Sequence, residues 1–508
     1  MSLTRLFIVP TAIALTCGAI YVYTRIRKGP ASTRLPPGPK KLPLIGNFFD
    51  MPTSFEWERY AAWAKEFNTD ILHLDVGGQS IIVLDTYEAC TELLDKRSKY
   101  YSTRPSFTMA VDLVGFDFNI GFIPYGDKWQ VIPRHLHGGL HGTASQRFEP
   151  IELKATHTFL RAMLLHATED DVEVELRHMA GIVILGMAYG LDIRKKDDTH
   201  VTAAENAQHV LCDVVIQGAY LVNSIPALKC VPEWMPGATF RRQAREWRAM
   251  NQDMAERPFR EVKEGMPVGD VPLAPSFVSS ALEKGVDDDI VRDAAATMYM
   301  AGTDTTVCAL LNFTLAMLDH TELQARAQAE LDALLPHGQL PGFVDEAQLP
   351  FVTAIVWESL RYTPVAPVGI PHAYSGEIPD NYNGYTIPKG SVIVYPDPGT
   401  FNAERFLTAE GKFNPDVRNP ADIIFGFGRR ACPGRNMAYA SVWITIASVL
   451  RTFNIEKAKG PYGSVIEPTR EYMSSLVLIP KHFKCRYVPR SEEAAATIRA
   501  TEIQQYGC

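Results

Sequence analysis

One cysteine in the sequence has neighbours that favour a metal-binding thiolate. Cys432 lies in the segment FGFGRRACPG (425–434), directly before an apolar run that predicts a helix from Met437 onward. Glycines allow a sharp turn and a close approach of the backbone to a flat ligand. The Arg430 guanidinium and the N-terminus of the following helix would lower the pKa of the thiol. The pattern predicts an anionic axial ligand for haem iron, and a structural cysteine in a glycine-rich turn is the alternative.

This segment resembles the F-x-x-G-x-R-x-C-x-G haem-binding signature of cytochromes P450. Its fixed positions are occupied here by Phe425, Gly428, Arg430, Cys432 and Gly434. The resemblance covers essentially the whole chain and is greatest to membrane-anchored P450s of fungal, particularly basidiomycete, secondary metabolism. It implies the P450 fold, which is mostly α-helical with small β-sheets. It also implies a haem b cofactor with Cys432 as iron ligand, and electrons from NADPH delivered through a reductase.

A second motif pairs an acid with two arginines. Glu358 and Arg361 lie three residues apart and so share one face of a helix. Arg405, in the downstream segment FNAERF (401–406), can complete a charged network around a buried carboxylate. An isolated E-x-x-R is common on exposed helices. The resemblance implies that this one forms the family's structural triad behind the haem.

A third motif, AGTDTT (301–306), lies in a long predicted helix. Gly302 and the Thr305 hydroxyl would loosen the helical hydrogen bonding there. The resemblance implies that Asp304 and Thr305 are catalytic and pass protons during oxygen activation. The alternative is that the threonines only bond to carbonyls one turn earlier.

The groups that would bind the haem propionates are less clearly marked. Trp129 resembles the family's propionate-binding tryptophan, but the arginine expected four residues later is replaced by Pro133, which also disrupts a helix interior. The remaining candidates are Arg134, His135, His372 and Arg430. His372 has the alternative of being a core residue that bonds within the fold.

The chain is shorter than the family pattern at one place. Val394 is followed directly by Tyr395-Pro396-Asp397-Pro398. Roughly a dozen residues of the pattern are absent, about a short strand and one or two helical turns. Either a coding segment was lost or the protein is shortened. Because the gap separates the Glu358 helix from Arg405, it would threaten the geometry of the triad.

The substrate pocket is expected above the haem and lined from separate segments. The candidates, taken from the family's substrate-recognition segments, are Phe107, Met109, Ala301, Val365, Ala366, Ser475 and Leu476. Most of them are apolar, as a lipophilic ligand requires. For Val365, Ala366 and Leu476 the alternative is a place in the core.

Hydrophobic periodicity predicts the elements that position these residues. The pattern predicts a hairpin at 70–84, mostly helix from 150 to 330 including 240–256 and 287–334, short strands at 363–394, a helix at 436–453 and a strand region at 476–488. The predicted organisation is a membrane anchor with its basic flank at 1–28, a proline-rich hinge at 29–43, one catalytic domain at 44–489 and a loose polar tail at 490–508.

The N-terminus carries a predicted membrane anchor. Residues 6–24 contain no charge and are just long enough to cross a hydrocarbon core of about 30 Å. Arg25, Arg27 and Lys28 follow, which favours a cytosolic catalytic domain. We therefore expect a single-pass protein of the endoplasmic reticulum membrane, with a cleaved signal peptide as the alternative.

Composition excludes several other classes. The 508-residue chain has 50 Lys and Arg against 58 Asp and Glu, a net charge of −8, which disfavours general nucleic-acid binding. Its eight cysteines are scattered without a CxxC pair, so neither a structural zinc site nor a disulfide framework is indicated. Unpaired cysteines fit a reducing compartment.

The resemblance implies a monooxygenase that inserts one oxygen atom of O2 into a lipophilic molecule, in terpenoid-like fungal biosynthesis. Its expected partners are NADPH-cytochrome P450 reductase and, as a further candidate, cytochrome b5. A basic surface containing Lys128, Arg429 and Arg435 would dock the acidic reductase. The alternative, motivated by the shortened segment, is a non-catalytic or unstable haem protein.

Overall fold

The computed structural model describes residues 34–140, 142–165, 172–194, 198–215, 219–265, 275–394 and 401–505. The predicted membrane anchor at 6–24 and the shortened junction after Val394 lie outside these residues. The α-helices are α2 (Glu56–Phe67), α3 (Tyr87–Cys90), α4 (Ser98–Tyr101), α5 (Asp127–Leu140), α6 (Thr143–Gln146), α7 (Glu149–Leu165), α8 (Val172–Tyr189), α9 (Thr199–Val215), α10 (Leu221–Ser224), α11 (Thr239–Gly265), α12 (Phe277–Glu283), α13 (Asp288–Asp319), α14 (Thr321–Leu334), α15 (Pro350–Tyr362), α16 (Ala421–Ile424), α17 (Arg435–Thr452) and α18 (Glu492–Gln505).

Short irregular helices connect these elements. They are the π-helices η1 (Thr91–Lys96) and η2 (Thr108–Leu113), and the 3-10 helices η3 (Pro226–Cys230), η4 (Phe343–Gln348), η5 (Ala403–Phe406), η6 (Gly428–Arg430) and η7 (Pro461–Gly463). The strands are β1 (Ile71–Val76), β2 (Gln79–Leu84), β3 (His372–Ala373), β4 (Asp380–Tyr382), β5 (Tyr385–Ile387), β6 (Val392–Val394), β7 (Phe453–Lys457), β8 (Tyr472–Met473), β9 (Ile479–Pro480) and β10 (Cys485–Pro489).

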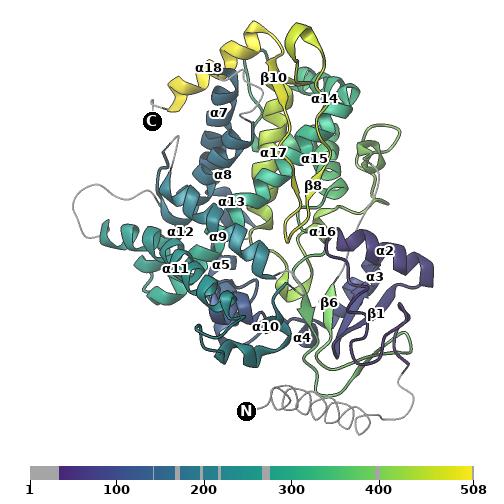
Figure 1. Ribbon diagram of the computed structural model, residues 1–508. Coiled ribbons are helices and arrows are strands. Elements are labelled where there is room, and N and C mark those ends of the chain that lie inside the picture. Colours follow the sequence, from purple (N-terminus) through teal and green to yellow (C-terminus); the bar gives the residue numbers. More distant parts are fainter. Residues whose placement is uncertain are drawn as a thin grey trace, which may run out of the picture.

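The strands form small sheets, as the sequence predicts. The largest has the order β1-β2-β6-β3, in which β1 and β2 make the expected antiparallel hairpin and β6 adds in parallel to β2. In Figure 1 this sheet lies at one side of the molecule beside α2 and α3, so the N-terminal hairpin meets a strand from far later in the chain. Three two-stranded sheets complete the β structure of the described residues.

The helices surround one long central helix, α13. Figure 1 shows α13 in the middle of the helical part, with α8, α9, α5 and α17 around it, and its largest packing interface is with α8. One continuous apolar core runs from Phe107 to Ile498, so the described chain is a single domain. Among the described helices α13 alone is long and apolar enough to cross a membrane, but 83% of that window is buried in the protein. It is therefore a core helix.

The expectation of a loose C-terminal tail is wrong. Residues Glu492–Gln505 form α18, which buries Ala495 and Ile498 and packs on α7 and α17. The segment EEAAATIRA is rich in strong helix formers, and its few apolar residues fall on one face. The segment therefore forms an amphipathic helix, although its composition is polar overall.

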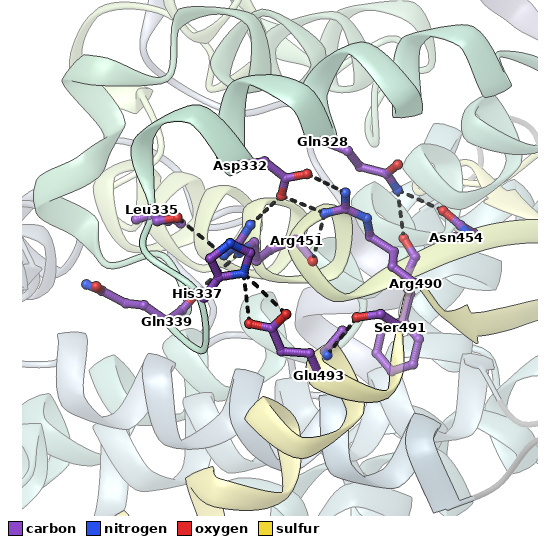
Figure 2. Close-up of polar contacts among 12 residues, drawn as sticks. Gln328, Asp332, Leu335, His337, Gln339, Arg451, Asn454, Arg490, Ser491 and Glu493 are labelled. Atoms are coloured by element: carbon purple, nitrogen blue, oxygen red, sulfur yellow. Dashed lines mark hydrogen bonds and ion pairs between the residues drawn. The ribbon is translucent and has the colours of Figure 1, made fainter.

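A polar network fixes the start of this helix. Figure 2 shows Asp332 of α14 between two guanidiniums, those of Arg451 and Arg490. Arg490 Nη1 also donates to the backbone carbonyl of Arg451 at 3.1 Å. His337 and Glu493 make a second, exposed contact at 2.9 Å. These contacts join the C-terminal end of the chain to α14 and α17.

Candidate functional site

The Cys432 segment is a tight loop that leads into α17. The Cys432 amide donates to the carbonyl of Phe425 at 2.7 Å, which closes the loop on itself. Gly426 and Gly428 both adopt positive φ. A Cβ on Gly428 would lie 2.3 Å from the Leu94 carbonyl oxygen, so this glycine permits close packing against η1. The loop therefore holds the Cys432 side chain, which is partly exposed, at the start of a buried helix.

The electrostatics of Cys432 differ from the sequence prediction. Burial raises the pKa of its thiol. The backbone amide of Gly434 and the charge of Arg435 lower that pKa, but burial outweighs them. Arg430 is not the compensating cation, because its guanidinium donates to three backbone carbonyls instead, those of Ser102, Ile120 and Ile123. The expected lowering of the pKa is thus wrong for the protein alone. Binding a metal ion supplies the missing charge and deprotonates a thiol outright.

Arg430 belongs to a buried cationic pocket. Its guanidinium lies 4.3 Å from the centre of the Trp129 ring and forms no ion pair among the described residues. Burial, and then the charge of Arg104, lower the pKa of Arg430 to about 8. The Trp129 Nε1 is buried without a hydrogen-bond partner in the described structure. An anionic group placed here would relieve the repulsion and accept from the indole, so the carboxylates of haem fit the pocket.

The other propionate candidates have different places. Arg134 and His135 follow Pro133 on α5, and the Arg134 side chain is exposed. The residues three and four positions after Trp129 share its helix face, and these are Ile132 and Pro133, neither of which can bind a carboxylate. His372 is buried and its Nδ1 lies 2.7 Å from the Tyr101 carbonyl. Burial, and then Arg104, hold the pKa of His372 well below its usual range, so it is neutral.

Sequence reasoning missed Arg104. This side chain is 7% exposed, and it donates through Nε to Gly121 and through Nη1 to Ile370. Its charge acts on both Arg430 and His372, which places it beside the same pocket. A single arginine in a loop carries no periodic signal. Its role becomes visible only where the chain segments converge.

The middle of α13 faces an internal space. Ala301 is exposed, and Gly302 and Thr305 are partly exposed, although the helix around them is buried. The Thr305 hydroxyl donates to the Ala301 carbonyl at 2.8 Å, one turn earlier. The helix is unbroken from Asp288 to Asp319, so no loosening is seen. A Cβ on Gly302 would lie 2.6 Å from the Ile184 side chain of α8, so this glycine serves helix packing.

Asp304 is turned away from that space. Its side chain is buried, and Oδ1 accepts from Arg177 Nη1 of α8 at 2.5 Å. Its Oδ2 is buried and has no hydrogen-bond partner in the described structure. Successive helical residues point about 100° apart, so α13 separates Asp304 from the exposed side of Thr305. The two predicted catalytic residues therefore lie on different faces.

The Glu358 network is intact. Glu358 is fully buried, accepts from Arg361 at 2.8 and 2.9 Å, and lies 3.3 Å from Arg405 Nε. The backbone amide of Asn402 also donates to it. The expected threat from the shortened segment is not seen, because the described residues on both sides of 395–400 keep these contacts.

The pocket candidates divide into two groups. Val365, Ala366, Ser475 and Leu476 are partly exposed, and Val365 and Leu476 pack around Cys308 of α13. The Leu478 amide donates to the Val365 carbonyl at 2.8 Å, which joins these segments. Phe107 and Met109 are instead buried in the main core. Phe107 packs edge-on against Phe122 at 5.3 Å between ring centres.

The predicted basic surface is smaller than expected. Lys128 lies 3.1 Å from the buried carboxylate of Asp293 and donates to the Asp117 carbonyl at 2.8 Å. It lines a cleft of about 410 Å³ between α5 and α13. Lys128 therefore has an acidic partner, although Arg292 contacts the same carboxylate at 2.8 Å. Arg429 donates to the Tyr125 hydroxyl at 2.7 Å, and Arg435 is exposed.

Comparisons with known proteins agree with this geometry. The family model described as Cytochrome P450 matches residues 36–486. The chain is 40% identical to cytochrome P450 monooxygenase 98 of Postia placenta, over 95% of this chain and 96% of the relative. It is 40% identical to cytochrome P450 monooxygenase ple1 of Rhodocybe pseudopiperita, over 92% of each chain. It is 37% identical to the tryptamine 4-monooxygenase of Psilocybe cyanescens, over 95% of this chain and 97% of the relative.

Proposed function

The chain belongs to the cytochrome P450 monooxygenase family, and from that premise we propose that it oxidises a neutral, lipophilic small molecule of fungal secondary metabolism. The observation that carries the proposal is the exposed stretch of α13 at Ala301 and Thr305, which lies in the interior of the molecule. Apolar residues of the segment that follows α15 and of the β8–β9 hairpin pack beside this helix. Such a site suits an apolar ligand with few polar groups.

The residues present fit haem b. Bound there, the haem supplies the activation of O2, using electrons that come from NADPH through a reductase. Cys432 Sγ is the group that would bind the iron. Trp129 Nε1 and the Arg430 and Arg104 guanidiniums would hold the carboxylates, and burial of these donors strengthens each contact. Thr305 would offer its hydroxyl to the oxygen side, and the surrounding apolar residues would exclude water.

The lining favours a neutral substrate over an amine. The partly exposed candidates carry methyl groups, hydroxyls at Thr305 and Ser475, and no carboxylate. Asp304, the acid next to Thr305 on α13, is paired with Arg177 of α8. A cationic amine would lose its hydration in this space without gaining a partner. We therefore expect a terpenoid-like substrate rather than one resembling tryptamine.

A spectroscopic experiment tests this function. The full chain in membranes should show the CO-difference band of a haem-thiolate, and C432A should abolish it. Neutral terpenoids should shift the Soret band at lower concentrations than tryptamine does. A366F should alter that binding without loss of the CO band. Absence of the band in the wild type would favour the non-catalytic alternative, and tighter binding of tryptamine would contradict the substrate class.

We also propose attachment to the endoplasmic reticulum membrane. The candidate anchor at 6–24 lies outside the described residues, but large apolar side chains are exposed elsewhere. Phe49 is 77% exposed, and in the segment after α10 Trp234 is 78% exposed. Aromatic residues of this kind favour the membrane interface. Carbonate extraction should leave the full chain in the membrane fraction, and its release would contradict the proposal.

The proposed redox partners are NADPH-cytochrome P450 reductase and cytochrome b5. Arg429 and Arg435 flank Cys432 in sequence, and both are exposed. They are the basic residues beside the Cys432 loop at which an acidic electron donor would dock. Complementary charge mainly raises the association rate, so this contact is expected to depend on salt.

A further inference from the structure

One buried side chain of α9 lacks the hydrogen bonds that an amide normally makes. Gln208 is 6% exposed, and among the described residues its side-chain amide has a single partner, the Cys212 thiol, at 3.8 Å from Nε2. Sulfur is a weak acceptor, and the Gln208 Oε1 oxygen has no donor in the described part of the chain. A buried amide in this condition lowers the stability of the fold, so its presence needs an explanation.

Two other buried glutamines show how an amide with a structural role is bonded in this protein. Gln324 is 4% exposed, and its Nε2 donates to the carbonyls of Met317 and Ile455 at 2.8 and 3.0 Å. Its Oε1 accepts from the Ile455 backbone amide at 2.9 Å. Gln328 donates to two oxygen atoms of β7, at 3.0 and 3.1 Å. Both side chains join α14 to β7, whereas the contacts within the described residues give Gln208 no such role.

Gln208 lies where α9 approaches the β8–β9 hairpin and α13. Gln208 and Cys212 are separated by one helical turn and share a face of α9. The Cys212 thiol meets the hydroxyl of Ser475 in the hairpin, and it also lies near the Cys308 thiol of α13. Cys308 belongs to the apolar cluster that contains two of the pocket candidates. The Gln208 amide is therefore beside the predicted pocket and not at the outer surface.

The surroundings of this amide are otherwise apolar. The cluster around Cys308 consists of Val477 and Ile479, with Val365 and Leu476 packed against it. Cys308 follows Thr305 by about one turn of α13, which is roughly 5 Å along the helix axis. A molecule of ten carbon atoms is long enough to cover that separation. A lipophilic ligand with one polar group thus fits a site that has one unsatisfied amide.

Resting on the proposed function, we propose that Gln208 is a specificity-determining residue that binds a hydroxyl group of the substrate, so that the enzyme acts on a lipophilic alcohol. The hydroxyl donates its proton to Gln208 Oε1, the atom that lacks a donor, while Nε2 keeps its contact with Cys212. A ketone oxygen has no proton to donate, and a hydrocarbon has no polar atom. Either analogue leaves Oε1 buried and unpaired, and a site of this kind discriminates against such ligands.

The proposal also gives this enzyme a place in a reaction sequence. A substrate that already carries a hydroxyl group must come from an earlier step that installs oxygen, either by oxidation or by addition of water. The hydroxyl group bound by Gln208 is retained, because it serves as an anchor and is not the position that is oxidised. The product is therefore expected to carry two oxygen functions.

The first measurement compares ligands that share one carbon skeleton. The probes are menthol, menthone and p-menthane, and 2-decalol, 2-decalone and decalin. The Soret shift of the full chain in membranes gives an apparent Kd for each probe. The variant Q208M keeps the length of the side chain and removes the amide. In at least one set, the ratio of the Kd of the alcohol to that of the hydrocarbon should rise about tenfold in Q208M, and the ratio for the ketone should change less.

Membrane partitioning of a probe is the same for both proteins, so a change in the ratio reports the residue. The control Q252M replaces an exposed glutamine of α11 and should leave every ratio unchanged. Equal ratios in wild type and Q208M for both sets would overturn the proposal. So would the absence of a Soret shift with both alcohols.

The second measurement needs neither ligand nor turnover. Without added ligand, the Tm of Q208M should equal or exceed that of wild type, because an apolar side chain replaces an amide that lacks partners. The matched variant Q324M breaks three hydrogen bonds of a buried glutamine and should lower the Tm by at least about 2 °C. A fall in the Tm of Q208M as large as that of Q324M would identify a structural amide and overturn the proposal.

Failure of the two proposals can be told apart. A wild-type chain without a haem-thiolate band would overturn the proposed function, and the Tm comparison of Q208M with Q324M would still test the state of the Gln208 amide. A chain that has the band and prefers neutral terpenoids to tryptamine, but shows equal Kd ratios in wild type and Q208M, would overturn only the hydroxyl site.

Discussion

At the scale of single residues, the site is defined by groups whose charge is not balanced by the protein alone. Cys432 is a thiol whose pKa burial raises, and Arg430 is a partly buried cation whose hydrogen bonds go to the neutral carbonyls of Ser102, Ile120 and Ile123. Trp129 Nε1 has no partner there. The metal centre of a ligand would supply the positive charge that favours the Cys432 thiolate. Carboxylates of the same ligand would pair with Arg430 and accept a hydrogen bond from Trp129 Nε1. Stability is therefore expected to depend on the cofactor.

A buried carboxyl outside this pocket gives a prediction of pH-dependent stability. Burial raises the pKa of Glu152 to about 7, although a hydrogen bond from Ser441 opposes the shift. Because burial disfavours the ionised carboxylate, the folded state binds the Glu152 proton more tightly than the unfolded state does. The stabilisation of the folded state that results is present below the ordinary carboxyl range and is lost as pH rises toward 7. The full shift corresponds to at most about 3 kcal/mol.

The substitution E152Q should remove that pH dependence. At pH 8 the Tm of the variant is expected to equal or exceed that of wild type. At pH 5 its Tm should not be higher than that of wild type. The control E58Q changes an exposed glutamate of α2 and should leave the profile unchanged. A parallel pH profile for E152Q and wild type would contradict the raised pKa.

At the scale of elements, close contacts between helices decide which residues are tolerated. Gly302 is the point at which α8 approaches α13, and α8 also supplies Arg177 to Asp304. The same interface therefore sets helix packing and the position of the acid. A glycine in a helix is unfavourable by itself, so its presence here is explained by the neighbouring helix.

G302A is expected to destabilise the fold. The added methyl group would meet Ile184 at 2.6 Å, and overpacking of this kind costs about 1–3 kcal/mol. Thermal unfolding of the full chain measures the change, and I184A in the same chain should restore part of the loss. The control G138A adds a methyl group within α5 where nothing lies within 4 Å, and should be neutral or slightly stabilising. A neutral G302A would refute the close approach.

The docking of α18 gives a prediction for the C-terminus. The hydrogen bond from Arg490, helped by Arg451, lowers the pKa of Asp332, so the stabilisation is present at neutral pH and is lost as pH falls. D332N should lower stability at pH 7 by on the order of 1 kcal/mol, because the carboxylate is partly exposed. It should also speed proteolytic cleavage near Arg490. The control D319N breaks a different exposed pair, with Arg470, and should not expose α18.

At the scale of the whole molecule, acidic net charge coexists with a small basic surface near Cys432. The net charge is −8, and Lys128 is paired with Asp293, so Arg429 and Arg435 are the stronger candidates on this surface. Docking of an acidic electron donor then depends on few charges. Its rate should consequently be sensitive to each of them and to ionic strength.

R429E should slow reduction of the haem by reductase about tenfold at low salt, and less at high salt. Stopped-flow measurement of the reduction rate at two salt concentrations tests this. Y125F removes the hydrogen bond to Arg429 without changing charge and should leave the rate unchanged. R499E reverses a charge on α18 and should also have no effect. An equal loss for R429E at both salt concentrations would exclude electrostatic docking.

Local sequence patterns were enough to predict the family, the cysteine loop, the helix that carries AGTDTT and the E-x-x-R pair. These are local patterns, because a few neighbouring residues specify a turn, a helix face or an i,i+3 contact. The hairpin at 70–84 and the helix at Arg435–Thr452 follow from the same short-range periodicity.

Which distant groups meet could be learned only from the folded chain. It placed Arg104 beside Arg430, Arg177 on Asp304, Asp293 on Lys128, and α18 on α7. Each of these contacts joins residues far apart in the chain, so no spacing in the sequence encodes it. Burial then changed the electrostatics, because a group's pKa depends on the charges and solvent around it and not on its neighbours in sequence.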